Sequence, residues 1–280
     1  MRTRIIKYFI TLSALFFGAV LGYAQGNVYT VRARLSDFYS CTTKVVLSDN
    51  EMVDAILTDA VSIGWRISPY EFCSSVEYEQ IKGDASFYFL RIVYKDSEPG
   101  LAFLSLEKGG KAGRGSSFDS AFIVVMIPID KSDFSTGRCP TYLPAFINIV
   151  QTYVEDAMIQ EGRSLVGLTM YNKHLLSNEY TRAIVAENDI DPRTSVPGYI
   201  ELMDIAETDT AFEQGGHYLV GLTICPEFPQ RGAKSYQFIL TADTHEIYFY
   251  HVRKYDNYDS CGLTAKDISL LSKSMKYANR

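Results

Sequence analysis

The sequence predicts an α/β module followed by an α+β module, and three observations lead to this fold class. Apolar residues recur at helical spacing in two long stretches of the N-terminal half. Short runs of β-branched and aromatic residues separate these stretches, as in β-α-β units. In the C-terminal half three such runs follow one another directly, which is typical of an antiparallel meander. We expect the modules at residues 25–165 and 166–280 of the 280-residue chain.

Helices and strands alternate in the expected first module. The capping-box spacing S-x-x-E begins at Ser48 and again at Ser74, and each occurrence predicts the start of a helix. Pro144 suits the first turn of a longer helix that ends at Gly162. The expected strands are 28–35, 44–47, 65–70, 87–94, 101–106 and 122–129. The order is therefore β-α-β-α-β, followed by a hairpin and a long helix.

The expected second module contains more strand than helix. Its strands are 181–186, 200–205, 217–225, 235–241 and 246–253, with a short helix at 209–214. Thr264 and Asp267 have the spacing of a cap for a final helix that runs to Met275. No segment of the sequence repeats another.

The first 24 residues have the three parts of a secretory signal. Arg2, Arg4 and Lys7 form a basic start, an apolar run follows from Tyr8 to Leu21, and small residues precede a cleavage site after Ala24. No cysteine stands at that site for acylation. We expect a periplasmic or secreted protein that neither spans the membrane nor carries a lipid anchor after cleavage.

Charge and cysteine spacing exclude several functions. Without its first 24 residues the chain has 24 basic and 33 acidic side chains, a net charge of −9, which is unsuited to phosphate backbones. We therefore expect no nucleic-acid partner. The five cysteines are scattered and contain no CxxC spacing, so neither a thioredoxin-like site nor a zinc ribbon is indicated, and their pairing stays open.

Several segments resemble an uncharacterised family of exported proteins from Bacteroidota. They are Gly22–Gln25, Ile67–Cys73, Phe87–Leu90, Tyr142–Ile149 and Ala242–Tyr250. The resemblance spans most of the mature chain and implies export but no known activity. In addition, residues 44–94 are similar in pattern to the N-terminal module of the Tol-system propeller protein, and the closing hairpin is similar to that of PepSY modules.

A glycine-rich stretch, 109–117, is the first candidate site. Its glycines do not have P-loop spacing, and a strand rather than a helix is expected to follow. We interpret it as a hairpin loop whose basic residues bind a partner or an anion. These residues are Lys108, Lys111 and Arg114.

Acidic residues and histidines give two further candidates. Eight acids crowd around the single base Arg193, and we expect a solvated acidic face there, with a weak cation site as the alternative. These acids are Glu187, Asp189, Asp191, Glu201, Asp204, Glu207, Asp209 and Glu213. His245 and His251 would share one strand face near Asp243 and Glu246, which leaves open a hydrolase with a carboxylate and histidine site.

Tyrosines of the closing hairpin are the last candidate. Tyr248 and Tyr250 share one strand face, which either lies under the final helix or forms an exposed binding surface. We expect a non-enzymatic envelope protein that needs no metal or cofactor and binds a protein partner, through these tyrosines or the basic loop.

Overall fold

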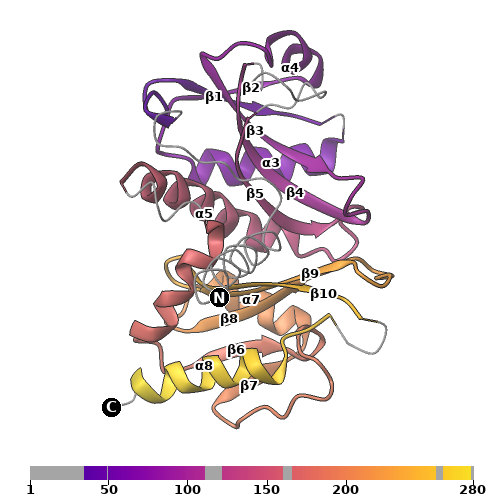
Figure 1. The fold of residues 1–280 in the computed structure, drawn as a ribbon, viewed down its shortest axis with the longest axis vertical. Coiled ribbons are helices and arrows are strands. Elements are labelled where there is room, and N and C mark those ends of the chain that lie inside the picture. The colour runs from indigo at the N-terminus through magenta and orange to yellow at the C-terminus, as the bar shows by residue number, and fades with distance from the viewer. Residues whose placement is uncertain (1–34, 49, 111–121, 160–165, 257–260, 279–280) are drawn as a thin grey trace, which may run out of the picture.

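The computed structural model describes residues 35–48, 50–110, 122–159, 166–256 and 261–278. Two five-stranded sheets lie one above the other along the long axis of the molecule (Figure 1). The expected α/β module and the following module with an antiparallel meander are both confirmed. The signal segment, residues 28–34 of the expected strand 28–35, Lys111 and Arg114 lie outside the described residues, and Leu35 is helical instead of extended. No helix within the described ranges has the length and apolar character needed to cross a bilayer.

The first sheet has the strand order β2-β1-β3-β4-β5. Strand β1 is parallel to both β2 and β3, whereas β3, β4 and β5 form an antiparallel meander. The elements in chain order are β1 (Thr42–Val46), α3 (Glu51–Gly64), β2 (Tyr70–Cys73), α4 (Ser75–Ile81), β3 (Phe87–Tyr94), β4 (Leu101–Lys108), β5 (Phe122–Lys131) and α5 (Cys139–Ile159).

The second sheet repeats this topology. Its order, taken from the other edge, is β7-β6-β8-β9-β10, with β6 parallel to β7 and β8 and with β8, β9 and β10 antiparallel. Its elements are η1 (Gly167–Ser177), β6 (Ala183–Ala186), η2 (Glu187–Asp189), β7 (Ile200–Met203), α7 (Ile205–Gln214), β8 (Leu219–Ile224), β9 (Lys234–Thr241), β10 (Ile247–Lys254) and α8 (Ala265–Ala278). The short helix η2 and a loop replace the counterpart of α3. The two sheets thus share one topology although no repeat is visible in the sequence.

Local caps explain where several helices begin. Ser74 accepts a hydrogen bond from the Glu77 amide, and Thr264 and Asp267 cap α8 reciprocally, as expected. The predicted cap at Ser48 is wrong: Asn50 caps α3, while Ser48 binds Asp54. The amide oxygen of Asn50 lies close enough to accept from two amides of the first turn.

Two further boundaries differ from expectation. Helix α5 begins at Cys139, so Pro144 lies inside it and Pro140 occupies the first turn. The predicted strand 65–70 is instead a bend that leads into β2, which begins at Tyr70, and the buried indole of Trp65 donates a hydrogen bond to the Ser68 carbonyl across this bend.

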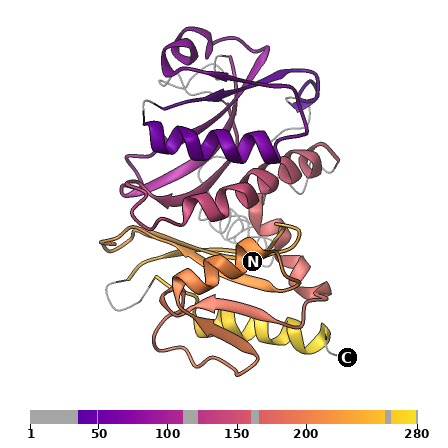
Figure 2. The same ribbon diagram turned by 180° about the vertical axis from the view of Figure 1, so that it is seen from behind.

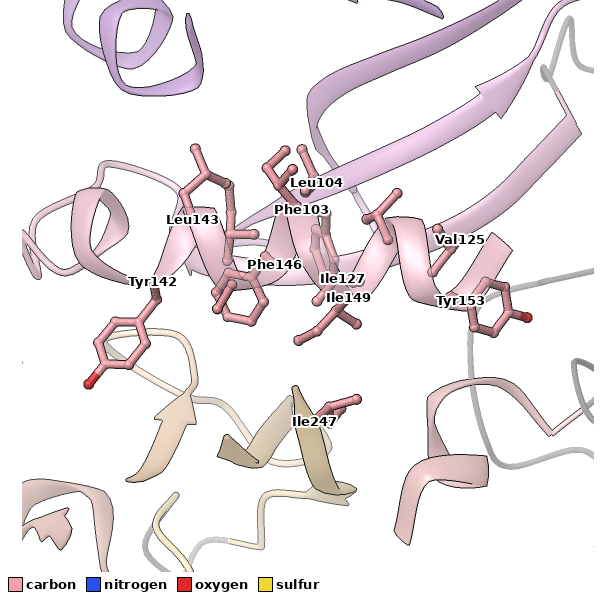
Figure 3. Packing of buried hydrophobic residues seen from close by; sticks show 14 of the residues in the cluster. Phe103, Leu104, Val125, Ile127, Tyr142, Leu143, Phe146, Ile149, Tyr153 and Ile247 are labelled. Carbon is pink, nitrogen blue, oxygen red and sulfur yellow. The ribbon is translucent and has the colours of Figure 1, made fainter. Parts of the chain in front are cut away.

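Helix α5 packs between the two sheets (Figure 2). Leu143 points toward the first sheet, where Phe103, Leu104, Val125 and Ile127 lie, and Ile247 lies on the opposite side of the helix (Figure 3). The rings of Phe146 and Phe238 are 5.5 Å apart, so the core is continuous across both modules. Helix α8 covers the outer face of the second sheet (Figure 1).

Candidate functional site between the modules

The closing-hairpin tyrosines are buried. Tyr248 packs edge-on against His174 and Tyr180, with ring centroids 5.3 and 5.4 Å away. Tyr250 lies against Phe238 in the core beside α5. Both rings are therefore covered, and the hairpin does not present them as a contact surface. The expectation that they share one strand face is wrong, because a register shift between Ile247 and Phe249 places Tyr248 in the cluster with α8 and Tyr250 in the cluster with α5.

Lys108 ends β4 and is held in place. Its ammonium donates to Asp37 at 2.5 Å and lies 4.7 Å above the ring of Tyr88. Desolvation acts to raise the pKa of Asp37, but hydrogen bonds from Lys108 and Tyr88 lower it overall, so the carboxylate stays charged. Lys108 therefore holds the segment at Asp37 against the first sheet and does not stand free in a loop.

Three of the four residues of the hydrolase alternative have partners that differ from one to the next. Asp243 accepts hydrogen bonds from His217 and Tyr180, whereas His251 pairs with Asp267 at 3.1 Å. His245 stacks on Phe212, and burial lowers its pKa. Across the described residues, no three His, Cys, Asp or Glu side chains gather as metal ligands would. The hydrolase hypothesis has therefore lost the cluster on which it depended.

The acidic segment is only partly a solvated face. Asp189 and Asp191 are each 4% exposed, so the expected solvation is wrong for these two. Asp191 pairs with Arg193 at 2.7 Å, whereas Asp189 faces a base from the other module. The sequence pattern around Arg193 did not indicate this second base, because it lies 51 residues before Asp189 in the chain.

That base is Arg138, which precedes α5 and joins the modules. The turn before it needs the left-handed conformation of Gly137, whose φ is +70°. The guanidinium donates to Asp189 at 2.8 Å, to Asp209 at 3.0 Å and to the Tyr142 hydroxyl at 3.1 Å. Burial acts against its charge, but the two carboxylates dominate and raise the pKa of Arg138. Arg138 and the carboxylates of Asp189 and Asp209 therefore form a buried ionic contact between the modules.

Asp130, at the end of β5, carries an unsatisfied acceptor beside this cluster. The side chain is 3% exposed; its Oδ1 accepts from the Thr136 hydroxyl at 2.6 Å and from the Lys131 amide at 2.7 Å. Its Oδ2 accepts no hydrogen bond from any described residue. Desolvation raises the pKa of Asp130. Ionisable groups with a perturbed pKa are found preferentially at functional sites. Asp130, Arg138, Asp189 and Thr223 line a cavity of about 410 Å³, the buried recess.

A wider opening lies next to it. This seam recess, about 630 Å³, is lined by residues of 97–101, 131–133 and 226–234, so both modules contribute. Lys131 lines both recesses. On its wall the Glu98 carboxylate binds Lys234 at 3.1 Å, and it also bonds Lys95 and the Tyr236 hydroxyl. Hydrogen bonds to these partners outweigh desolvation and lower the pKa of Glu98.

Phe228 stands in the loop between β8 and β9 that lines the seam recess. Its side chain is 84% exposed, although it is a large apolar residue. Pro226 and Pro229 flank it, and this combination of an aromatic residue with two prolines between strands was the sequence signal that could have identified the loop.

Comparison with known proteins finds no matching family model, no similar curated protein and no similar solved structure.

Proposed function

We propose that this chain is an exported, non-enzymatic protein of the cell envelope, periplasmic or secreted, that binds a protein partner at the seam recess. The observation that carries the proposal is Phe228, which is almost fully exposed at an opening lined by both modules. The signal-like segment of residues 1–24 and the resemblance to exported proteins of Bacteroidota support the compartment.

The chemistry of the seam recess suits a protein partner. Aromatic anchors contribute most of the binding free energy in protein interfaces, while mixed charges form the rim. Around Phe228 this rim consists of both signs: Asp133, Lys131, Glu227, Arg231 and Lys234. With Glu98, the lining has three acidic and three basic side chains, so the rim is close to neutral and does not select a strongly charged ligand.

The prolines beside Phe228 favour binding further. Proline restricts the backbone, so a loop that contains two of them loses less conformational entropy when it is ordered against a partner. The loop follows Ile224, the buried last residue of β8, with Cys225 and Pro226 next in the chain. The anchor is therefore presented on a constrained loop.

The test is capture of a partner from the envelope fraction of the source cells with the mature protein as bait. We expect Phe228→Ser to reduce the specific partner at least about tenfold, as loss of an interface anchor does. Leu176→Ser is the matched control, because Leu176 is 85% exposed but lies on η1 outside the recess. Equal recovery by wild type and Phe228→Ser, with both folded by circular dichroism, contradicts the proposal.

A further inference from the structure

Two of the five cysteines lie together although they are far apart in the sequence. Cys225 directly follows β8, and Cys261 lies shortly before α8. The Cys225 thiol donates a hydrogen bond to the Cys261 sulfur. Both residues are partly exposed and line an open cavity of about 350 Å³, the thiol recess, which lies beside Asp189.

The register of the second sheet holds this pair in place. Ile224 of β8 is opposite Tyr236 of β9, so Cys225 comes next to Ser235. The Ser235 hydroxyl and the Gln237 amide both donate to the backbone carbonyl of Cys261. Side chains on β9 therefore fasten Cys261 over the strand end that carries Cys225.

Gly262, which follows Cys261, brings this segment into close contact with the backbone at Ile190. A Cβ at Gly262 would lie 2.4 Å from the backbone carbon of Ile190, closer than real Cβ atoms come. The next residue, Leu263, exchanges backbone hydrogen bonds with Asp189 and Asp191. Only glycine permits this close contact, so the position of Cys261 is determined by backbone as well as side-chain contacts.

The pKa values of the two thiols shift in opposite directions. The hydrogen bond from Cys225 and the nearby charge of Arg253 lower the pKa of Cys261. The pKa values of the other cysteines are raised, that of Cys225 mainly by its hydrogen bond to Cys261 and those of Cys41, Cys73 and Cys139 mainly by burial. Because the thiolate is the nucleophile, the lowered pKa favours Cys261 for the first attack.

We propose that Cys225 and Cys261 are joined by an intramolecular disulfide bond when the protein meets a disulfide-bearing oxidant. The Cys261 thiolate attacks one sulfur of the oxidant, forming a mixed disulfide and releasing the first thiolate of the oxidant. Cys225 then loses its proton and attacks the Cys261 sulfur of the mixed disulfide, which releases the second thiolate of the oxidant. Two protein thiols are oxidised, one external disulfide is reduced, and both protons end on the released thiols.

The bond connects the loop of the seam recess to the segment before α8. Cys225 is three residues before Phe228, so the crosslink fastens the base of the proposed binding loop. The inference does not depend on the proposed function, because it concerns only the contact between the two sulfurs.

Peptide mapping tests it directly. Trypsin cleaves after Arg193, Arg231, Lys254 and Lys266, so Cys225 and Cys261 fall into separate peptides, 194–231 and 255–266, which contain no other cysteine. The mature protein is reduced, transferred to a buffer of oxidised glutathione, alkylated and digested without reductant. We expect the two peptides to be linked, with a mass two hydrogens below their sum, and to separate on addition of dithiothreitol.

Variants make the result specific. Cys41→Ser should leave the link intact, whereas Cys225→Ser should abolish it and leave Cys261 as the fastest of the remaining thiols to react with iodoacetamide. Separate alkylation of Cys225 and Cys261 in the oxidised sample overturns the proposal. A link from either cysteine to Cys41, Cys73 or Cys139 in the folded protein overturns it as well.

Discussion

Replacing Arg138 by methionine tests whether the ionic contact between the modules stabilises the fold. Met is of similar length but removes the hydrogen bonds to Asp189, Asp209 and Tyr142. Asp209 remains bonded to the Tyr142 hydroxyl and is partly exposed, so the main cost comes from Asp189, which is buried and loses its counter-charge. Breaking a buried pair on one side costs about 3–5 kcal/mol. We expect this loss in the free energy of unfolding of Arg138→Met.

The assay is urea unfolding followed by two signals. Trp65, the one tryptophan of the sequence, reports on the first module, and far-ultraviolet circular dichroism reports on both. We expect the two transitions to coincide in the wild type, because α5 and Arg138 couple the modules, and to separate in Arg138→Met.

Two matched variants identify the cause. In the double variant Arg138→Met/Asp189→Asn the stranded charge is gone and Asn still accepts from the Thr223 amide, so about 2 kcal/mol or more of the loss should be recovered. Arg182→Met breaks the exposed pair with Glu201 and should cost at most about 1 kcal/mol. The reasoning is refuted if Arg138→Met loses less than about 1 kcal/mol, or if the double variant is no more stable than the single one.

Acidification gives an independent check on the same variant. Desolvation raises the pKa of Asp189 above its ordinary value even with Arg138 present. A carboxyl group whose pKa is raised on folding destabilises the protein as pH rises through that value, and protonation removes the effect. The difference between wild type and Arg138→Met should therefore shrink as pH falls toward 3.8, whereas a loss due to packing alone would not change with pH.

Three further outcomes are expected. Because desolvation raises the pKa of Asp130, Asp130→Asn should increase the free energy of unfolding at pH 7, and the gain should vanish toward pH 3.8; urea titrations at both pH values check this. Forming the Cys225–Cys261 bond closes a loop of about 37 residues, so the oxidised protein should be about 4 kcal/mol more stable than the reduced one in the same denaturant series. Gly262→Ala should destabilise the fold by about 1–3 kcal/mol and slow formation of that bond in oxidised glutathione; unchanged kinetics would contradict the contact with Ile190.

Sequence patterns predicted most elements because those patterns are local. Ser74 caps α4 and Thr264 caps α8 as their spacing indicates. Where the prediction failed, neighbouring residues make other contacts: Asn50 displaced Ser48 as the cap of α3, and Trp65 bonds to Ser68 across a bend where a strand was expected. Sequence spacing alone does not distinguish well between neighbouring residues that can each form a similar hydrogen bond to the backbone.

The candidate site was harder to predict than the fold. The sequence left open whether Tyr248 and Tyr250 are covered or form a surface, since it does not show that η1 and α5 cover both faces of the hairpin. The loop around Phe228 carried a usable signal, an apolar residue between two prolines.

The sequence by itself determined the alternation of strands and helices, the signal-like first 24 residues and the acidic charge that follows once they are removed. Only the tertiary structure decided the common topology of the two sheets, the pairing of Arg138 with acids 51 and 71 residues away, and the contact of Cys225 with Cys261. The physical reason is distance along the chain: helix and strand periodicities and caps act over a few residues, whereas pairs that join separate elements exist only after the core has packed.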